Sequence, residues 1–271
     1  MVEHIAFIGG GNMANAIISG LIRQGIAATR IDVVEPDVQA QQKLKAQFGI
    51  QAHARAGSDL AKATLVVWAV KPQTFKEAAL QVRFHTKSAL HLSVAAGIRS
   101  DSISRWLGNE RIVRSMPNTP ALIGKGIAGL YARPAVSAAD RQVAQEVIQT
   151  TGDFVWLTAE DQLDAVTAIS GSGPAYMFYF MEAMTDAGEV MGLTRDQACE
   201  LAIATCIGAG ELARSSTEPP EILRQRVTSK GGTTHAAITS MEESGVKELF
   251  TKALFAAQTR ARELGNEFGE S

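Results

Sequence analysis

The stretch HIAFIGGGNMA, residues 4–14, decides the fold class of this 271-residue chain. An apolar run leads into three consecutive glycines, and a helical pattern follows. Gly9, Gly11 and Ala14 supply the spacing G-x-G-x-x-A. The first glycine permits a tight turn, the second lets a pyrophosphate approach the backbone, and the small third residue lets helix and strand pack closely. The stretch therefore predicts a strand that enters a dinucleotide-binding turn, with Asn12 and Met13 also beside the cofactor.

Short apolar runs alternate with helical patterns up to about residue 157. Five such runs are HIAFIG (4–9), RIDVVE (30–35), TLVVWAV (64–70), LHLSVAA (90–96) and RIVRSMP (111–117). Alternation of strand and helix indicates a mainly parallel sheet that is covered on both faces. Two further runs, 126–132 and 153–157, are expected to extend this sheet at its edge. We therefore expect an α/β, Rossmann-type domain over residues 1–160.

From Thr158 onward the strand patterns stop and helical patterns take over. They cover 159–191, 195–214, 219–227, 235–243 and 246–264. Thr194 with Gln197 forms a capping-box pattern, which marks a helix start. Pro174, inside SGSGPAY, either kinks the first of these helices or opens a new one. Residues 161–271 are expected to form an all-helical domain for dimerisation and substrate binding.

Composition and charge narrow the function classes. Hydrophobic residues make up 46% of the chain and charged residues 20%, as in ordinary globular proteins. A net charge of −2 argues against nucleic acid as a partner. Cys199 and Cys206 stand too far apart on one helix for a disulfide, so we expect small buried residues and a reducing compartment. Without room for a signal peptide before residue 4, and with SGSGP interrupting 165–181, we expect a cytoplasmic protein that does not enter membranes.

Glu35 ends the second predicted strand, 35 − 9 = 26 positions after Gly9. A carboxylate at this place can accept hydrogen bonds from the ribose hydroxyls of NAD and repel the 2′-phosphate of NADP. Alternatively, Glu35-Pro36-Asp37 is only a solvated turn, since strand ends favour such residues. The residues leave both interpretations open.

Three later strand ends supply further cofactor candidates. In AVKP the candidates are Ala69, Val70, Lys71 and Pro72, at the edge where ligands bind in such sheets; Lys71 as an exposed loop residue is the alternative. In SVAAG they are Ala95, Ala96 and Gly97, whose small size admits a nicotinamide ring or merely allows dense packing. In MPNTP the candidate is Asn118, which two prolines hold in place, unless the segment is only a rigid turn.

The segment TSKGGTTHAAI, residues 228–238, places four hydroxyl side chains and a Gly-Gly pair directly before a helical pattern. Glycines let backbone N–H groups approach a ligand closely, and a helix N-terminus attracts anions. The segment therefore predicts a cradle for a small carboxylate.

Six elements in this order resemble the pyrroline-5-carboxylate reductase family. They are FIGGGNMA (7–14), AVKP (69–72), SVAAGI (93–98), RSMPNTP (114–120), ISGSGPAY (169–176) and VTSKGGTT (227–234). The resemblance implies a Rossmann domain followed by a helical domain that interlocks with its twin in a homodimer, and family members often assemble into rings of dimers. It also implies reduction of the cyclic imine L-1-pyrroline-5-carboxylate to L-proline, the last step of proline biosynthesis, with NADPH or NADH.

The resemblance places the substrate between the nicotinamide and the loop SKGGTT. It assigns substrate binding to Ser229, Gly232, Thr233 and Thr234, and catalysis to Thr234 and Ser229. Thr234 as a plain helix N-cap is the alternative. The chain departs from many relatives at Glu35-Pro36-Asp37, where residues suited to a 2′-phosphate are common, so the choice between NADPH and NADH stays open.

Hydride addition to a C=N bond needs no protein nucleophile, which fits the lack of a Ser-His-Asp set and of metal-spaced histidines. We therefore predict no metal. Two rivals remain. A hydroxyacid dehydrogenase shares the two-domain plan but carries a lysine soon after its glycine-rich helical motif, and here no lysine follows SGSGP before Lys230. A regulator that senses NAD(P) would bind the cofactor without turnover.

Overall fold

The computed structural model describes residues 4–270. The chain divides into two compact units. The sheet unit comprises the chain up to Ser172 together with the chain from Ala257 onward, and the helical unit is Gly173–Ala256.

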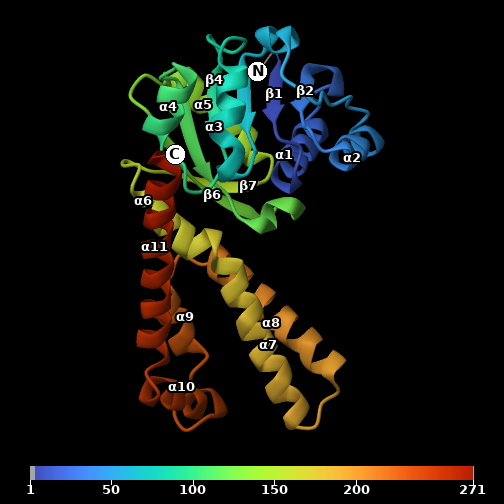
Figure 1. Ribbon diagram of the computed structural model, residues 1–271. Helices are drawn as coiled ribbons and strands as arrows, with labels where there is room; N and C mark the ends of the chain where they lie inside the picture. The colour runs from blue at the N-terminus through green and yellow to red at the C-terminus, as the bar shows by residue number, and fades with distance from the viewer. Residues whose placement is uncertain (1–3, 271) are drawn as a thin grey trace. The chain divides into compact units, whose positions relative to one another are not determined.

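Seven strands form the single sheet of the sheet unit (Figure 1). They are β1 (Ile5–Ile8), β2 (Ile31–Val34), β3 (Leu65–Trp68), β4 (Leu90–Ser93), β5 (Ile112–Met116), β6 (Gly126–Ala132) and β7 (Gly152–Trp156). The order is β2-β1-β3-β4-β5-β6-β7, and every neighbouring pair is parallel except β5–β6. The predicted mainly parallel sheet, with β6 and β7 toward one edge, is confirmed. The strand order reverses at β1, and such a switch point is where open α/β sheets bind ligands.

Helices cover both faces of the sheet. They are α1 (Asn12–Arg23), α2 (Val38–Phe48), α3 (Pro72–Val82), α4 (Ser100–Leu107) and α5 (Ala138–Gln149). Phe7 packs in one core cluster with residues of α1, α2 and α5, whereas its neighbour Ile8 packs in a second cluster with residues of α3 and α4. Successive strand side chains point to opposite faces, so this alternation produces the three-layer arrangement.

Helix boundaries follow the capping signals of the sequence. Gly49 ends α2 at a φ of 71°, in the left-handed region that glycine adopts without strain. Thr194 and Gln197 form the predicted capping box at the start of α8. α6 (Gln162–Val166) continues into a π-helical turn, Thr167–Gly171, and α7 starts at Gly173. Pro174 therefore opens a new helix.

The helical unit contains α7 (Gly173–Val190), α8 (Arg195–Ser215), α9 (Pro220–Arg226), α10 (Thr233–Glu243) and the first part of α11 (Val246–Glu270). α11 runs six residues past its predicted end at 264. Its last turns belong to the sheet unit, where Phe268 packs against the cluster formed with α3 and α4. Apolar side chains in this polar stretch are too sparse for a clear helical period, which explains why the extension escaped prediction.

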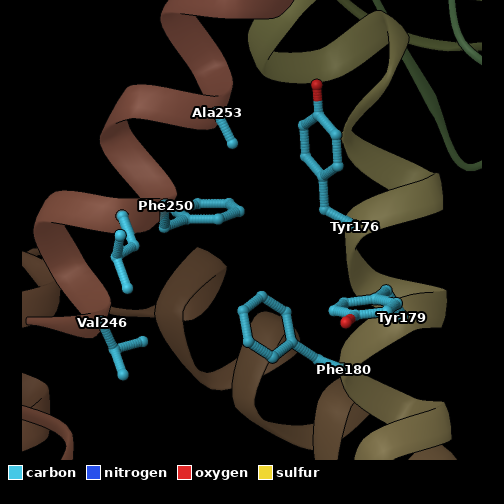
Figure 2. A pocket seen from close by; sticks show the side chains of 7 residues that line it. Tyr176, Tyr179, Phe180, Val246, Phe250 and Ala253 are labelled. Carbon is cyan, nitrogen blue, oxygen red and sulfur yellow. The ribbon is translucent and has the colours of Figure 1, made fainter. Parts of the chain in front are cut away.

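Much of the apolar surface in the helical unit is exposed. Phe178 is 63% exposed and Val190 90%. Side chains of α7 and α11 line a hollow of about 280 Å³ (Figure 2). Its lining residues are Tyr176, Tyr179, Phe180, Val246, Leu249, Phe250 and Ala253. An apolar surface of this kind marks an interaction face.

The predicted burial of the two cysteines is wrong for the single chain. Cys199 is exposed and Cys206 half-buried, and neither forms a disulfide. The buried residues of α8 are Ala198 and Ala202. Cys206 follows Ala202 by about one helical turn on the same face, which agrees with its partial burial, whereas Cys199 is exposed. Within residues 4–270, no helix combines the length and apolarity needed to cross a membrane.

His91 in β4 makes the stability of the fold depend on pH. The residue is 1% exposed, and its Nδ1 accepts a hydrogen bond from Trp68 Nε1 at 3.0 Å. Burial lowers the pKa of His91 from 6.5 to about 4. Between these values the unfolded chain binds a proton that the folded chain does not, so stability falls as the pH drops from 6.5 toward 4. We expect a loss of about 3 kcal/mol from this residue.

Urea unfolding at pH 7, 6, 5 and 4.5 checks this expectation. His91→Gln keeps an acceptor for the Trp68 indole but does not titrate, so its free energy of unfolding should fall less steeply across this range. Equal pH slopes for the two proteins would contradict the assignment.

Candidate functional site

Gly9 makes the turn between β1 and α1 possible. Its φ is +96°, and a Cβ at this position would lie 2.5 Å from the carbonyl oxygen of Ala69 and 3.0 Å from the amide nitrogen of Val70. Ala69 N–H in turn donates to Ile8 O at 2.8 Å. The structure therefore brings the predicted residues Gly9, Ala69 and Val70 together at the carboxyl ends of β1 and β3.

Gly11 leaves the N-terminus of α1 open. No heavy atom lies within 4 Å of where its Cβ would be. α1 has no side-chain cap and no acidic residue in its first turn, so its first N–H groups can meet an anion. Asn12 is exposed and Met13 half-buried. This open cradle fits the pyrophosphate of a dinucleotide.

Asn15 is a residue of this turn that the spacing rule did not single out. Its Nδ2 donates to the carbonyl oxygens of Gly10 and Gly11, at 2.7 and 2.8 Å. These bonds hold the two turn carbonyls against the first turn of α1. An amide residue four positions after the second glycine was the available signal.

Glu35 holds the glycine-rich turn to the end of β2. Its Oε2 accepts from Gly10 N–H at 2.7 Å, and its Oε1 accepts from Asp37 N–H at 2.8 Å. The side chain is half-buried, so it is more than a solvated turn residue. A carboxylate has about four acceptor sites, of which these two backbone bonds use two; a contact of Glu35 with the ribose stays a prediction.

The other predicted cofactor residues of β3 and β4 lie at the same edge of the sheet. Lys71 is exposed, and Pro72 is the first residue of α3. Ala95 is buried, whereas Ala96 is exposed. Gly97 has a φ of +70°, and its Cβ would approach Leu264 and Phe268 at 3.4 Å. The small side chain of Ala95 therefore allows dense packing, and glycine at position 97 allows the positive φ. Of the three residues, Ala96 is the one whose side chain is exposed to solvent.

Asn118 is buried and braces the loop after β5. Its Nδ2 donates to Ser170 O at 3.1 Å, and its Oδ1 accepts from Ile127 N–H at 3.0 Å. The side chain thus joins β6 to the π-helical turn. Its contact with the cofactor stays a prediction.

The predicted substrate loop is an exposed turn before α10. Gly231 has a φ of +76°, and Gly232 N–H donates to Ser229 O at 3.0 Å. A Cβ at Gly232 would lie 2.6 Å from Ser229 Oγ, so glycine keeps the hydroxyl close to the backbone. Ser229, Thr233 and Thr234 are exposed.

The N-cap alternative for Thr234 is wrong. Gly232 is the N-cap of α10 and Thr233 its first helical residue, and no side chain caps this helix. Removing the Thr234 hydroxyl therefore removes no cap. All four predicted substrate residues belong to the helical unit, whereas the predicted cofactor residues belong to the sheet unit.

Sequence reasoning missed a buried ion pair in the sheet unit. Arg114 NH1 lies 2.7 Å from Glu160 Oε1. Burial lowers the pKa of Arg114, and the charge of Glu160 opposes this shift. The second arginine of the run RIVRSMP, in the middle of the strand, was the available signal, because a strand covered on both faces rarely holds an unpaired charge. Among residues 4–270, no three His, Cys, Asp or Glu side chains gather as metal ligands do.

Comparisons with known proteins agree with these observations. The family model for pyrroline-5-carboxylate reductase dimerisation matches residues 160–264, and one described as NADP oxidoreductase, coenzyme F420-dependent, matches residues 4–97. The pyrroline-5-carboxylate reductase of Pseudomonas aeruginosa is 45% identical over 268 residues, which is 98% of this chain and 98% of that protein.

Solved structures agree as well. A pyrroline-5-carboxylate reductase from Coxiella burnetii matches with a TM-score of 0.91 and 38% identity, over 97% of this chain and 98% of that chain. The Plasmodium falciparum pyrroline carboxylate reductase, solved with NADP bound, matches with a TM-score of 0.84 and 26% identity, over 97% and 98% of the two chains. The dinucleotide turn, the helical unit and these relatives together show that this chain belongs to the pyrroline-5-carboxylate reductase family.

Proposed function

We propose that this chain reduces L-1-pyrroline-5-carboxylate to L-proline with NADPH or NADH, the last step of proline biosynthesis. The observation that carries the proposal is the open, uncapped N-terminus of α1 behind Gly9 and Gly11, which fits a dinucleotide. The second support is 45% identity to a pyrroline-5-carboxylate reductase over nearly the whole chain. Loss of absorbance at 340 nm with this substrate, together with proline formation, tests the activity.

When bound, the reduced nicotinamide supplies a hydride to the electrophilic carbon of the C=N bond, and the ring nitrogen carries a proton taken from solvent, so that the amine of proline forms. The protein's own part is to bind and orient. The first N–H groups of α1 receive the pyrophosphate, and residues 95–97 are the proposed wall beside the nicotinamide. Ser229 and the N–H groups of Thr233 and Thr234 receive the substrate carboxylate, and Gly232, whose N–H donates to Ser229 O, shapes the turn that presents them. The Thr234 hydroxyl hydrogen-bonds the ring nitrogen or the carboxylate and so orients the reacting carbon. Positioning of this kind can lower a barrier by roughly 7–11 kcal/mol.

We place the boundary between the dinucleotide-binding domain (1–160) and the dimerisation and substrate-binding domain (161–271) where the dimerisation model begins to match. The exposed apolar side chains of the helical unit support a homodimer formed through this domain. Rings of dimers and a cytoplasmic location belong to the same proposal. The two cysteines, which form no disulfide, fit a reducing compartment.

Glu35 is the proposed determinant of cofactor preference. Glu35→Gln removes a negative charge from the proposed place of the ribose 2′ group. We expect the ratio of kcat/KM for NADPH to kcat/KM for NADH to rise roughly fivefold, because like-charge repulsion at close range is worth about 1 kcal/mol. Steady-state assays with each cofactor measure this ratio.

Asp37→Asn is the matched control, because Asp37 lies in the same turn but caps α2 with its carboxylate. Asparagine also caps helices well, so this variant changes charge and little else. Equal changes in the two variants would assign the effect to net charge, and an unchanged ratio in Glu35→Gln would remove Glu35 from cofactor selection.

The two rival functions make different predictions. A regulator that senses NAD(P) would bind the cofactor but oxidise none of it with the imine. A hydroxyacid dehydrogenase would oxidise a hydroxy acid with NAD(P)⁺ and ignore the imine. Two observations favour the reductase over both rivals: the loop 229–234, which suits a substrate carboxylate, and the 45% identity to a pyrroline-5-carboxylate reductase.

A further inference from the structure

Glu160 makes three hydrogen bonds inside the sheet unit. Its Oε1 accepts from Arg114 NH1 at 2.7 Å and from Ser100 N–H at 2.6 Å, and its Oε2 accepts from Ser100 Oγ at 2.6 Å. The side chain of Glu160 is 17% exposed and that of Arg114 is 9% exposed. Charge-assisted bonds that are shielded from water hold geometry more firmly than surface pairs do. The cluster is therefore a rigid point in the fold.

Ser100 is the first residue of α4, and the carboxylate of Glu160 accepts its N–H in place of a capping side chain from the neighbouring residues. The N-cap residue Arg99 makes no side-chain capping bond. The free N–H groups at a helix start need acceptors and favour negative charge. A carboxylate 60 positions away in the sequence supplies both, so the start of α4 is fixed by the loop that follows β7.

The segment between β4 and α4, residues 94–99, is thereby held at both ends. At its start, Val94 N–H donates to Trp68 O at 3.0 Å. Ser93, the last residue of β4, is the register partner of Arg114 in β5. At its end stands Ser100, bound to Glu160. The ion pair Arg114–Glu160 thus links the two ends of one short segment.

We propose that Glu160 is a positioning residue that fixes the loop 94–99 and so sets the place of the nicotinamide ring. This inference rests on the proposed function, in which residues 95–97 form the wall beside that ring. Arg114 orients the Glu160 carboxylate, and Ser100 transmits its position to the loop. A displacement of about 1 Å at a reacting centre can cost 10²-fold in rate. Removing the brace therefore lowers the rate of hydride transfer more than it weakens cofactor binding, because the pyrophosphate is held separately at α1.

The test compares Glu160→Ala with Asp140→Ala. Asp140 is the matched control, since its carboxylate also pairs with an arginine, Arg111 at 2.7 Å, and accepts an N–H at a helix start. The control pair differs from the test pair in its place in the fold. Asp140 belongs to α5 and Arg111 precedes β5, whereas Arg114 lies within β5. We expect Glu160→Ala to lower kcat 10- to 100-fold while the dissociation constant for NADH, measured by fluorescence, changes less than about threefold. Asp140→Ala should keep kcat within about twofold of wild type when assayed well below both melting temperatures.

Hydrogen exchange of the protein without cofactor supplies a readout that is independent of turnover. Amides of residues 94–100 should exchange at least tenfold faster in Glu160→Ala, and those of β5 should not. Glu160→Gln, which keeps an acceptor for Ser100, should recover part of kcat. If Glu160→Ala does not fold, Ser100→Ala removes one bond of the cluster and should still lower kcat and speed this exchange.

Four results separate the possible failures. Unchanged kcat in folded Glu160→Ala, or equal losses in Glu160→Ala and Asp140→Ala, would overturn the positioning role. Unchanged exchange at 94–100 would overturn it as well. Absence of turnover in the wild-type protein assayed alongside would refute the proposed function instead, and the exchange result would still report on the brace.

Discussion

Gly9→Ala is expected to destabilise the protein by about 3 kcal/mol, whereas Gly11→Ala is expected to leave its stability unchanged and weaken cofactor binding. An alanine at position 9 would have to adopt a φ of +96°, and its methyl group would lie 2.5 Å from the carbonyl oxygen of Ala69, the residue that follows β3. A left-handed conformation costs a non-glycine residue roughly 1–2 kcal/mol, and overpacking adds roughly 1–3 kcal/mol. The backbone of Ala69 is held by its hydrogen bond to Ile8 O, so it cannot move aside cheaply and the two costs add.

At Gly11 the same methyl meets empty space, and the φ of −73° suits alanine. That space is where we place the pyrophosphate, so Gly11→Ala should raise the dissociation constants for NADH and NADPH by about tenfold or more, which corresponds to about 1.4 kcal/mol. Urea unfolding and fluorescence titration measure the two effects separately. Equal stability losses in the two variants, or unaltered cofactor binding in Gly11→Ala, would contradict the assignment of this turn.

Thr234→Ala is expected to lower kcat/KM for pyrroline-5-carboxylate on the order of 10²-fold, because a hydrogen bond to a charged group contributes about 1.5–3 kcal/mol. Since Gly232 and not Thr234 caps α10, the melting temperature should change by no more than about 1 °C. Thr234→Ser restores the hydroxyl and should recover most of the activity. Thr234→Val keeps the shape without the hydroxyl and should behave like alanine.

The dissociation constant for NADH should stay the same in all three variants, because the residues that hold the cofactor lie in the other unit. An unchanged kcat/KM in Thr234→Ala would remove Thr234 from the mechanism. A lower melting temperature with full specific activity would assign it a role in stability only.

The secondary structure could be predicted well from the sequence, because strands and helix ends are marked by residues within the segment itself. All seven apolar runs became strands, Gly49 ended α2, and Thr194 with Gln197 started α8. The glycine turn was predictable for the same reason, since its spacing encodes a tight turn and an open helix start.

Features that depend on contacts between residues far apart in the chain could not be predicted from the sequence. The Glu160–Ser100 pair spans 60 positions, and nothing in the residues around either partner indicates the other. The last turns of α11 look polar, yet Phe268 packs on the sheet unit. The exposure of Cys199 also escaped prediction, because an apolar helical face that is exposed looks the same in sequence as a face that meets its own core.

The most direct test of the account follows the hydride itself. The enzyme is incubated with pyrroline-5-carboxylate and with NADPH or NADH that carries deuterium on the transferable position of C4, and the proline formed is analysed by mass spectrometry. Direct transfer between the two bound molecules predicts one deuterium per proline, at C5, in equal amount to the cofactor oxidised. Unlabelled proline, or labelled cofactor that stays reduced while the folded protein is saturated with imine, would contradict the account.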